Sequence, residues 1–411
     1  MILLLTETLT AGGAEIFVLR LARQLNKIGY KSIVFNYHKQ IVNKSLLKEF
    51  DDIQIIHFSL PFDKIILKAD RILLRLGIDF SFRQLFLTKK IRRIIDVNRI
   101  QVVHSHLFKV DYSFALINRS IRLRHVITNH GDYQLFHSMA AEGNNKHIIG
   151  FYKKAEYVFR KSSSIICISN KQWNYIADTY GVDLKNKMKI IYNGLTVEEA
   201  SPRSKTELGL SENVFVFGMV ARGIREKGWE FAISAFSKLE NQDAHLVLVG
   251  EGDYLKVKRE EIVKQKNIHW VGFSQNPLEW IALFNVGLLP SFYKAESQPN
   301  VILEYLSLGK PVISSDVGDV SVMLNIDNPN QCGFVIQVEN EEPEIDVREL
   351  SDRMDFYINN NQVLLNHSLN ALVRFKDFDM EKCAEKYINE YFPIKSGAEK
   401  PYTEQDDAGN K

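Results

Sequence analysis

The chain of 411 residues is 45% hydrophobic and 25% charged, a composition typical of a soluble globular protein. It is too long for one ordinary hydrophobic core, so we expect two domains. The three cysteines, Cys167, Cys332 and Cys383, are widely spread and form no CxxC pair, which argues against a disulfide framework and a cysteine-based zinc site and favours a reducing compartment.

The net charge of +2 hides a difference between the two halves of the chain. Residues 1–200 contain 30 Lys and Arg against 17 Asp and Glu, a net charge of +13. The remainder contains 22 basic and 33 acidic residues, a net charge of −11. This division predicts that only the first half faces an anionic partner.

The first half alternates short apolar runs with helical patterns. We expect strands at residues 2–5, 31–36, 53–57, 100–104, 126–128 and 164–168, and helices at 14–28 and 152–159. Residues 1–5 are too short to span a bilayer and lack the basic flank of a signal peptide, so they are predicted to form a buried strand. No other stretch reaches spanning length, which predicts a soluble or peripheral protein.

The second half repeats this alternation after a polar stretch near residue 198. We expect strands at residues 214–220, 245–249, 268–271, 286–289 and 311–315, with helices at 229–239, 255–266, 277–284 and 301–308. Strands that alternate with helices and are apolar on both faces indicate parallel sheets covered on both sides. The predicted fold is α/β, with two Rossmann-like, doubly wound domains that face each other across a cleft.

The predicted domains are residues 1–191 and 192–376. A closing amphipathic helix over 380–391 lies within the segment 377–393. The tail at 394–411 is polar and poor in apolar residues, which predicts disorder.

A glycine pair, Gly12-Gly13, follows the first predicted strand and opens the first helix. Glycines there let backbone N–H groups approach an anion at a helix N-terminus. A tight strand-to-helix turn explains the pair equally well. The pattern is not GxGxxG, which removes the main support for a dehydrogenase.

Histidines close two of the predicted strands: His104 and His106 lie at one end, and His130 lies at another. Both groups are predicted at carboxyl ends, where ligands bind in such sheets. A hydrogen-bonded structural role is the commoner one for such a histidine. A zinc site from these three residues is disfavoured, because no cysteine or carboxylate has ligand-like spacing nearby.

Charged residues cluster after two strands of the second half. Arg222 and Lys227 lie in a glycine-containing loop before a helix, a setting that suits a pyrophosphate or an ordinary solvated turn. Glu296 and Glu304 stand eight positions apart, and Glu304 is surrounded by apolar neighbours on a predicted helix, which is costly unless a polar group meets it. Asn300 is expected to cap that helix and to leave the N–H groups of Val301 and Ile302 facing an anion.

These motifs together resemble the GT-B glycosyltransferases of the large retaining family 4. The resemblance covers nearly the whole chain and rests on segments that occur in the family's order: GGAE, NHG, Cys167-Ile168-Ser169, IYNGL, RxxxxK, LVGEG, VGF and a Glu-x7-Glu pair. A Glu-x7-Glu pair alone is a weak signal, whereas eight ordered segments are a strong one. The closing helix resembles the family's last element, which crosses back onto the first domain.

The resemblance implies a role for each matching residue. Glu304 would bind the ribose, Glu296 the donor sugar near C3 and C4, and His130 the sugar near its C6 hydroxyl. Glu296 and His130 would thus be the catalytic residues. The donor's pyrophosphate would be held by these groups: Arg222, Lys227 and the backbone at Gly13, Val301 and Ile302. The family retains anomeric configuration and needs no metal or other cofactor.

A second basic feature is the helical pattern of Lys64, Lys68, Arg71 and Arg75, which share one face. Isoleucines and a leucine occupy the adjoining face at residues 65, 72 and 76. This pattern is typical of a helix that lies on anionic lipid. The alternative is an ordinary surface helix whose apolar side is part of the core. Nucleic acid fits less well, because stacking aromatics are lacking.

The leading hypothesis is a retaining hexosyltransferase that uses a nucleotide diphosphate sugar in polysaccharide biosynthesis. UDP is the expected nucleotide on family frequency, and a lipid-linked or surface glycan is the expected acceptor. The expected location is the cytoplasm, peripheral to the inner face of the cell membrane. A sugar-nucleotide epimerase and a non-catalytic sugar-nucleotide or membrane-binding protein are the alternatives. An epimerase would need carboxylates from both domains, and the first domain offers mainly histidines.

Overall fold

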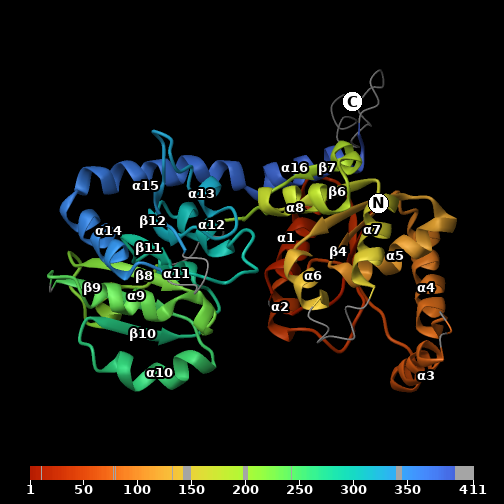
Figure 1. Cartoon of the computed structure of the whole chain (residues 1–411), viewed down its shortest axis with the longest axis horizontal. Coiled ribbons are helices and arrows are strands. Elements are labelled where there is room, and N and C mark those ends of the chain that lie inside the picture. The colour runs from red at the N-terminus through yellow and green to blue at the C-terminus, as the bar shows by residue number, and fades with distance from the viewer. Residues whose placement is uncertain are drawn as a thin grey trace, which may run out of the picture. The chain divides into compact units, whose positions relative to one another are not determined.

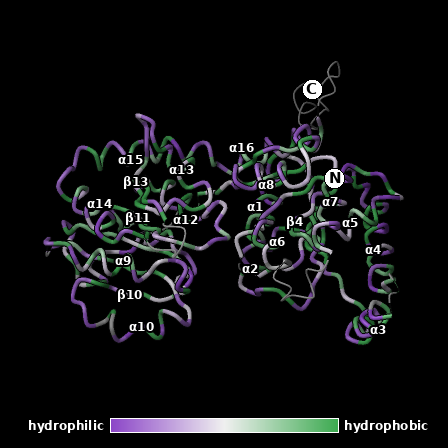
Figure 2. The backbone as a smooth tube through the Cα atoms, viewed as in Figure 1, coloured by the Kyte–Doolittle hydropathy of each residue, from purple (hydrophilic) through white to green (hydrophobic). Residues whose placement is uncertain are grey.

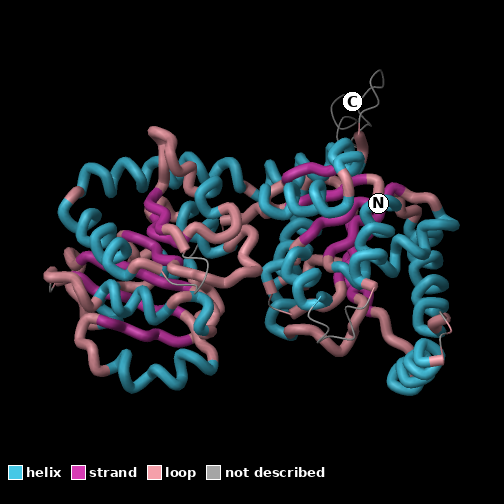
Figure 3. Tube along the Cα trace, viewed as in Figure 1, coloured by secondary structure: helices cyan, strands magenta, loops and turns pink. Residues whose placement is uncertain are grey.

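The computed structural model describes residues 1–10, 12–76, 78, 80–131, 133–141, 150–197, 202–241, 243–338 and 345–393. The predicted disordered tail at 394–411 lies outside them. Unit 1 comprises Met1–Gly194 and the segment that begins at Met380, and unit 2 comprises Leu195–Asp379. The chain passes between the two units after Gly194 and after Asp379, each three residues beyond the predicted boundaries at 191 and 376. In each unit, helices flank a central sheet (Figure 3).

Unit 1 contains a seven-stranded parallel sheet in the order β3-β2-β1-β4-β5-β6-β7. The strands are β1 (Ile2–Thr6), β2 (Ser32–Asn36), β3 (Ile55–His57), β4 (Val102–His106), β5 (Arg124–Asn129), β6 (Ser164–Cys167) and β7 (Met188–Ile190). The last of these was not predicted from the sequence. It is a three-residue edge strand with exposed Lys189 at its centre, so it lacks a continuous apolar run.

Helices cover both faces of the unit 1 sheet (Figure 1). They are α1 (Gly13–Lys27), α2 (Lys44–Glu49), α3 (Asp63–Arg75), α4 (Phe82–Asn98), α5 (Phe108–Ile121), α6 (Tyr133–Ala141), α7 (Phe151–Lys161) and α8 (Asn170–Tyr180). Successive residues of β1 point to opposite faces, so Leu4 joins the core with α1 while Leu3 and Leu5 join the core with α4 and α5. A strand buried on both faces reads as an unbroken apolar run, which explains the run of leucines near the start of the chain.

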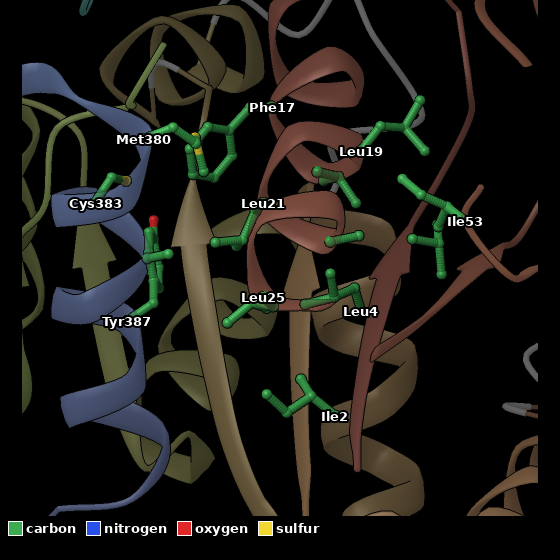
Figure 4. Packing of buried hydrophobic residues seen from close by; sticks show 14 of the residues in the cluster. Ile2, Leu4, Phe17, Leu19, Leu21, Leu25, Ile53, Met380, Cys383 and Tyr387 are labelled. Carbon is green, nitrogen blue, oxygen red and sulfur yellow. The ribbon is translucent and has the colours of Figure 1, made fainter. Parts of the chain in front are cut away.

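The closing helix α16 (Met380–Tyr391) packs on unit 1. Figure 4 shows Met380, Cys383 and Tyr387 pointing toward Phe17 and Leu21 of α1. These side chains are at most 3% exposed, so the end of the chain completes the first hydrophobic core. Deletion of this helix would expose that apolar surface to water.

Unit 2 contains a six-stranded parallel sheet in the order β10-β9-β8-β11-β12-β13. The strands are β8 (Phe215–Val220), β9 (Ala244–Val249), β10 (Ile268–Gly272), β11 (Val286–Leu289), β12 (Val312–Ser315) and β13 (Gly333–Ile336). The helices are α9 (Trp229–Phe236), α10 (Asp253–Val263), α11 (Leu278–Ile281), α12 (Asn300–Ser307), α13 (Val320–Met323), α14 (Val347–Asn359) and α15 (Asn361–Phe375). The predicted α/β class and doubly wound form are therefore confirmed.

The strand order reverses at one place in each sheet. This place lies between β1 and β4 in unit 1, and between β8 and β11 in unit 2. In open parallel sheets, ligands bind beyond the carboxyl ends of the strands at such a reversal. The segments that follow these four strands therefore define where the candidate site residues have to be sought. Of the helices described, none has both the length and the apolar character that a membrane span requires.

Candidate functional site

The loop after β8 carries the two predicted cations of unit 2. It contains Gly223 and Gly228, and both glycines are required by close backbone approaches. A Cβ on Gly223 would lie 2.4 Å from the backbone nitrogen of Gly252. Gly228 has a φ of +79°, and a Cβ there would lie 1.7 Å from the carbonyl oxygen of Pro290. The loop is therefore held tightly against the segment that follows β11.

Hydrogen bonds join the loop after β8 to the loop after β11. The carbonyl oxygen of Glu226 accepts from the backbone N–H of Phe292 at 2.9 Å and from the hydroxyl of Ser291 at 3.1 Å. On its other side the loop is fixed by Trp229, whose indole N–H donates to the carbonyl of Arg222 at 2.9 Å. Backbone groups thus position the loop, which leaves the side chains of Arg222 and Lys227 available for other contacts.

Lys227 and Glu296 form an ion pair between these two loops. Their side chains are only 11% and 10% exposed. The ring of Tyr293 lies beside both cations, with its centroid 5.2 Å from the Lys227 ammonium and 5.5 Å from the Arg222 guanidinium carbon. The structure therefore brings together three predicted site residues: Lys227 pairs with Glu296, and one aromatic ring lies beside Lys227 and Arg222.

The charge of Lys227 depends on this environment. Burial and the neighbouring cation of Arg222 lower its pKa from 10.5 to about 8, and Glu226 partly opposes this shift. The ammonium is thus still the dominant form at neutral pH, but it loses its proton at a much lower pH than an exposed lysine does.

Helix α12 follows the same loop and is fixed by Tyr305. The Tyr305 hydroxyl accepts from the backbone N–H of Val220 at 3.0 Å and donates to the carbonyl of Leu288 at 3.2 Å. These bonds attach the helix to the carboxyl ends of β8 and β11. Gly287 permits this packing, because a Cβ there would lie 2.5 Å from the Tyr305 ring.

Two expectations for α12 are wrong. Pro299 is the N-cap residue, and Asn300 is the first helical residue, with no side-chain cap at this terminus. The Ile302 N–H is not free, because it donates to the carbonyl of Pro299 at 3.1 Å. Glu304 is half-buried and faces away from the fully buried side of the helix, so its desolvation cost is smaller than its apolar neighbours in the sequence suggested.

The loop after β12 contacts the backbone directly after Glu296. Gly318 has a φ of +60°, and a Cβ there would lie 2.4 Å from the carbonyl oxygen of Ser297. The same carbonyl accepts from the backbone N–H of Asp319 at 2.9 Å. The loops after β8, β11 and β12 therefore contact one another at the carboxyl edge of the unit 2 sheet, and the backbone directly after Glu296 is fixed between them.

In unit 1, Gly13 begins α1 and Gly12 is its N-cap residue. The carboxylate of Glu15 turns back toward this end of the helix, where it accepts from the hydroxyls of Thr8 at 2.6 Å and Thr10 at 2.9 Å. A Cβ on Gly12 would lie 2.4 Å from a carboxylate oxygen of Glu15. The helix N-terminus already has an acidic side chain beside it, which favours the tight-turn explanation of Gly12.

The three candidate histidines of unit 1 lie within or directly after β4 and β5. His104 and His106 are fully buried within β4, not in the loop that follows it. His104 contacts the hydroxyls of Tyr391 at 2.6 Å and Thr128 at 2.8 Å, which is a structural role. A ring nitrogen of His106 lies 3.0 Å from a ring nitrogen of His130. Burial lowers the pKa of His130 to about 3, so its imidazole is neutral.

Within the described ranges, no cluster of three or more histidine, cysteine, aspartate or glutamate side chains has an arrangement that could hold a metal ion.

The structure places the four predicted lipid-facing cations on the exposed side of α3: Lys64, Lys68, Arg71 and Arg75.

Both halves of the chain match glycosyltransferase families. Residues 11–199 match the family described as Glycosyltransferase Family 4, and residues 212–355 match the family described as Glycosyl transferases group 1. The chain is a group 1 glycosyltransferase.

Two curated relatives match more than half of this glycosyltransferase. The uncharacterized glycosyltransferase MJ1059 of Methanocaldococcus jannaschii is 27% identical over 337 residues, which cover 68% of this chain and 82% of that protein. The capsular polysaccharide biosynthesis glycosyltransferase CapH of Staphylococcus aureus is 27% identical over 247 residues, which cover 56% of this chain and 64% of CapH.

Solved structures share the architecture of this glycosyltransferase. A glycosyltransferase from Rickettsia africae superposes with a TM-score of 0.74 at 19% identity and covers 95% of this chain and 97% of its own. Anabaena HepE in complex with UDP superposes with a TM-score of 0.72 at 18% identity and covers 94% and 98%. The fold is therefore the GT-B fold with two Rossmann-like units, as predicted.

The structure also adds residues to the site of this glycosyltransferase that sequence reasoning missed. Tyr293 contacts both cations, yet an aromatic in a loop carries no periodic signal. The sequence singled out His104 and His106 together, and the structure distinguishes them, because only His106 has a ring nitrogen within 3.0 Å of one of His130 in the described contacts. Glu15 lies within the GGAE segment that the resemblance quoted, and only its hydrogen bonds to two threonines reveal that it turns back on the helix.

Proposed function

We propose that this glycosyltransferase transfers a hexose-type sugar from a nucleotide diphosphate sugar, with UDP as the nucleotide, and retains the anomeric configuration. The acceptor is a lipid-linked or surface glycan in polysaccharide biosynthesis. The observation that carries the proposal is the cluster at the carboxyl ends of β8 and β11, in which Lys227 pairs with Glu296 and lies with Arg222 beside the Tyr293 ring. Two cations and a carboxylate match the two chemical ends of such a donor, its pyrophosphate and its sugar.

Each site residue has a role in this proposal. Arg222 and Lys227 bind the pyrophosphate and stabilise the negative charge that develops as the nucleotide leaves. The start of α12, at Asn300 and Val301, adds the positive end of a helix beside these cations. Glu304 accepts the ribose hydroxyls, and Glu296 accepts hydroxyls of the transferred sugar. His130 contacts the same sugar.

The chemical step in this proposal is a displacement on one face of the sugar. The acceptor oxygen forms a bond to the anomeric carbon as the bond to the phosphate oxygen breaks. The nucleotide diphosphate leaves with the bonding electron pair, and the acceptor's proton passes to a phosphate oxygen. No metal or other cofactor takes part, because Arg222 and Lys227 supply the positive charge that a divalent ion supplies elsewhere.

The relatives agree with this proposal. CapH is named for capsular polysaccharide biosynthesis, and HepE has been crystallised with UDP and with UDP-glucose. These names support a nucleotide-sugar donor and a polysaccharide product for this chain.

The test is a panel of UDP-, GDP- and ADP-sugars incubated with the full chain, with and without a lipid-linked acceptor. Release of nucleotide diphosphate is measured first, because slow transfer to water reports donor use without knowledge of the acceptor. The anomeric configuration of the product is then read by NMR. We expect turnover with a UDP-sugar and a retained configuration. No binding or release with any donor would contradict the proposal, and an inverted product would contradict the retaining mechanism alone.

A matched pair of variants connects this activity to the site. Glu296→Gln removes the buried carboxylate, and Glu240→Gln removes an exposed carboxylate of unit 2 that lies outside the cluster. We expect turnover to fall about tenfold to a hundredfold in the first, since a hydrogen bond to a charged group contributes roughly 1.5–3 kcal/mol. The second variant keeps the activity of the wild type.

A further inference from the structure

Apolar side chains are unusually exposed on α3 and α4 of unit 1. Of the 22 large hydrophobic residues that are exposed in the described part of the chain, nine lie between residues 62 and 86. They are Phe62, Ile65, Ile72, Leu76, Ile78, Phe80, Phe82, Leu85 and Phe86, with exposures from 41% to 76%. A soluble monomer rarely leaves so many apolar side chains together on its surface, so this cluster indicates a binding surface.

Helix α3 has an inner and an outer apolar face. Ile66, Leu67 and Leu73 are half-buried on the side of α3 that packs on α4. Ile65 and Ile72 lie on the opposite side, with exposures of 64% and 56%. The alternative in which this apolar stripe is part of the core is therefore wrong. Figure 2 shows hydrophilic and hydrophobic segments alternating along α3, as a helix with mixed outer faces requires.

A basic stripe lies beside the outer apolar stripe. Lys64, Lys68, Arg71 and Arg75 recur every three or four residues, and all four side chains are exposed. Helix α4 also exposes both apolar and basic side chains. Its first turns expose aromatic and aliphatic side chains, and its next turns expose a second set of cations: Lys89, Lys90, Arg92 and Arg93. Apolar side chains at one end of the helix, followed by cations, match the layers of a bilayer surface, in which the hydrocarbon lies beneath the phosphate groups.

Two acidic residues of the described part of this region, Asp63 and Asp70, form contacts within it. Asp63 pairs with Arg83 at 3.0 Å, and Arg83 lies over the ring of Tyr37 at 4.1 Å. Asp70 accepts from the hydroxyl of Ser81 at 2.7 Å and from the backbone N–H of Phe82 at 2.8 Å, which caps α4. These two carboxylates are therefore engaged with groups other than the exposed cations of α3 and α4. Their contacts also fix α3 against α4 as a preformed platform.

The platform is hydrogen-bonded to the carboxyl edge of the unit 1 sheet. Arg83 donates to the carbonyl of Tyr37, the residue that directly follows β2. Because all strands of this sheet are parallel, Tyr37 lies at the same edge as the ends of β4 and β5, where His106 and His130 meet. Figure 1 shows α3 at the end of α4, away from the strands of the sheet.

We propose that the exposed face of α3 and the first turns of α4 dock on an anionic lipid bilayer, with the apolar side chains inserted among the lipids and the cations at the phosphate level. The occupant is a bilayer because cations flank the apolar surface on both helices, which is the charge complement of anionic headgroups. If the proposed function holds, docking presents a lipid-linked acceptor to the edge of the sheet that carries His130.

The first test is flotation of the full chain with vesicles of phosphatidylcholine alone and with vesicles that also contain phosphatidylglycerol. Binding is expected only with the anionic lipid, and it should weaken as salt is raised. Each cation near an anionic surface contributes about a fivefold factor in partitioning, so replacement of four predicts a loss of roughly a hundredfold or more. The variant that carries this change replaces Lys64, Lys68, Arg71 and Arg75 with Gln.

The matched control replaces four exposed lysines elsewhere with Gln: Lys238, Lys264, Lys382 and Lys386. It carries the same change in net charge and should bind as the wild type does. A second variant, Ile65→Ser with Ile72→Ser, keeps the cations and should lose binding at high salt first. Its control is Leu369→Ser with Val373→Ser on α15, where both side chains are also exposed.

Several results would overturn docking on lipid. Equal flotation with both vesicle types, or unchanged flotation of both α3 variants, would do so. A dimer of the wild type that dissociates in the Ile65→Ser, Ile72→Ser variant would assign the surface to a second copy of the chain. Vesicle binding is measured without any sugar donor, whereas nucleotide release is measured without vesicles. Failure of docking and failure of the proposed function are thus distinguishable.

Discussion

The Lys227 ammonium and the Glu296 carboxylate neutralise each other at a place where neither is more than 11% exposed. A buried ion pair contributes little net stability, because desolvation of both charges offsets their attraction. Loss of one partner is costly, since the other charge is then left without compensation. The pair therefore has to be explained by what else the two groups can bind, and a donor with a pyrophosphate and a sugar offers a partner for each.

This relationship predicts opposite effects on stability and activity. Lys227→Met should lower the free energy of unfolding by about 3–5 kcal/mol, because Glu296 is left buried and unpaired. Lys227→Met combined with Glu296→Leu should recover most of that loss, while donor turnover stays absent in both. Urea unfolding and nucleotide release measure the two quantities. A double variant as unstable as the single one would show that the pair does not explain the stability loss.

The lowered pKa of Lys227 predicts a pH dependence of donor binding. Its pKa of about 8 means that the ammonium is lost as the pH rises through that value, so affinity for UDP should fall between pH 7 and pH 9. Calorimetric titration with UDP measures this, and Lys227→Arg should bind with little change over the same range. If the arginine variant shows the same decline, another group is responsible.

The same shift also affects the stability of the protein. An unfolded lysine has a pKa near 10.5, so between about pH 8 and pH 10.5 the unfolded chain binds more protons at this residue than the folded one does. The contribution of Lys227 to the free energy of unfolding therefore rises with pH across that window. Comparison of the wild type with Lys227→Arg by urea unfolding at both ends of the window would isolate it.

His130 is predicted to act as a neutral imidazole. Its pKa of about 3 places its titration below the range in which most proteins stay folded, so it should produce no inflection in the rate profile between pH 5 and pH 8. His130→Asn should lower kcat about a hundredfold, and His245→Asn in β9 of unit 2 should leave it unchanged. An inflection near pH 6 that disappears in His130→Asn would contradict the neutral form.

The contact between Gly228 and Pro290 predicts a large effect of one methyl group. Gly228→Ala should lower the free energy of unfolding by more than about 3 kcal/mol, since the left-handed φ and the collision with the Pro290 carbonyl add together. Gly209→Ala is the control. Its φ is +69° and nothing lies within 4 Å of the added Cβ, so it should cost only about 1–2 kcal/mol. Equal losses would mean that the loop moves away from Pro290.

The absence of a metal from the proposed reaction is testable without a variant. Turnover with a UDP-sugar in the presence of EDTA should equal turnover with added Mg²⁺ if Arg222 and Lys227 supply the positive charge. A loss of activity in EDTA that Mg²⁺ restores would contradict this part of the proposal.

The sequence by itself determined the class of fold and the segments that carry the site. Strands buried on both faces require continuous apolar runs, so those near residues 2, 245 and 286 were visible, and the glycines and charged residues after them were predicted to lie at strand ends. Side-chain contacts between such loops depend on distances that no local pattern encodes. The pairing of Lys227 with Glu296 and the position of Tyr293 beside it are of this kind.

Only the tertiary structure decided which face of α3 is buried. The periodicity of Lys64, Ile65, Lys68 and Ile72 is the same whether the isoleucines face a core or water, because amphipathic spacing records two faces and not what covers them. The packing of Ile66 and Leu73 toward α4 supplies that information and leaves Ile65 exposed. The same reason explains the error at Asn300, since a residue that can cap a helix does so only if the backbone before it turns at that position, and here it turns at Pro299.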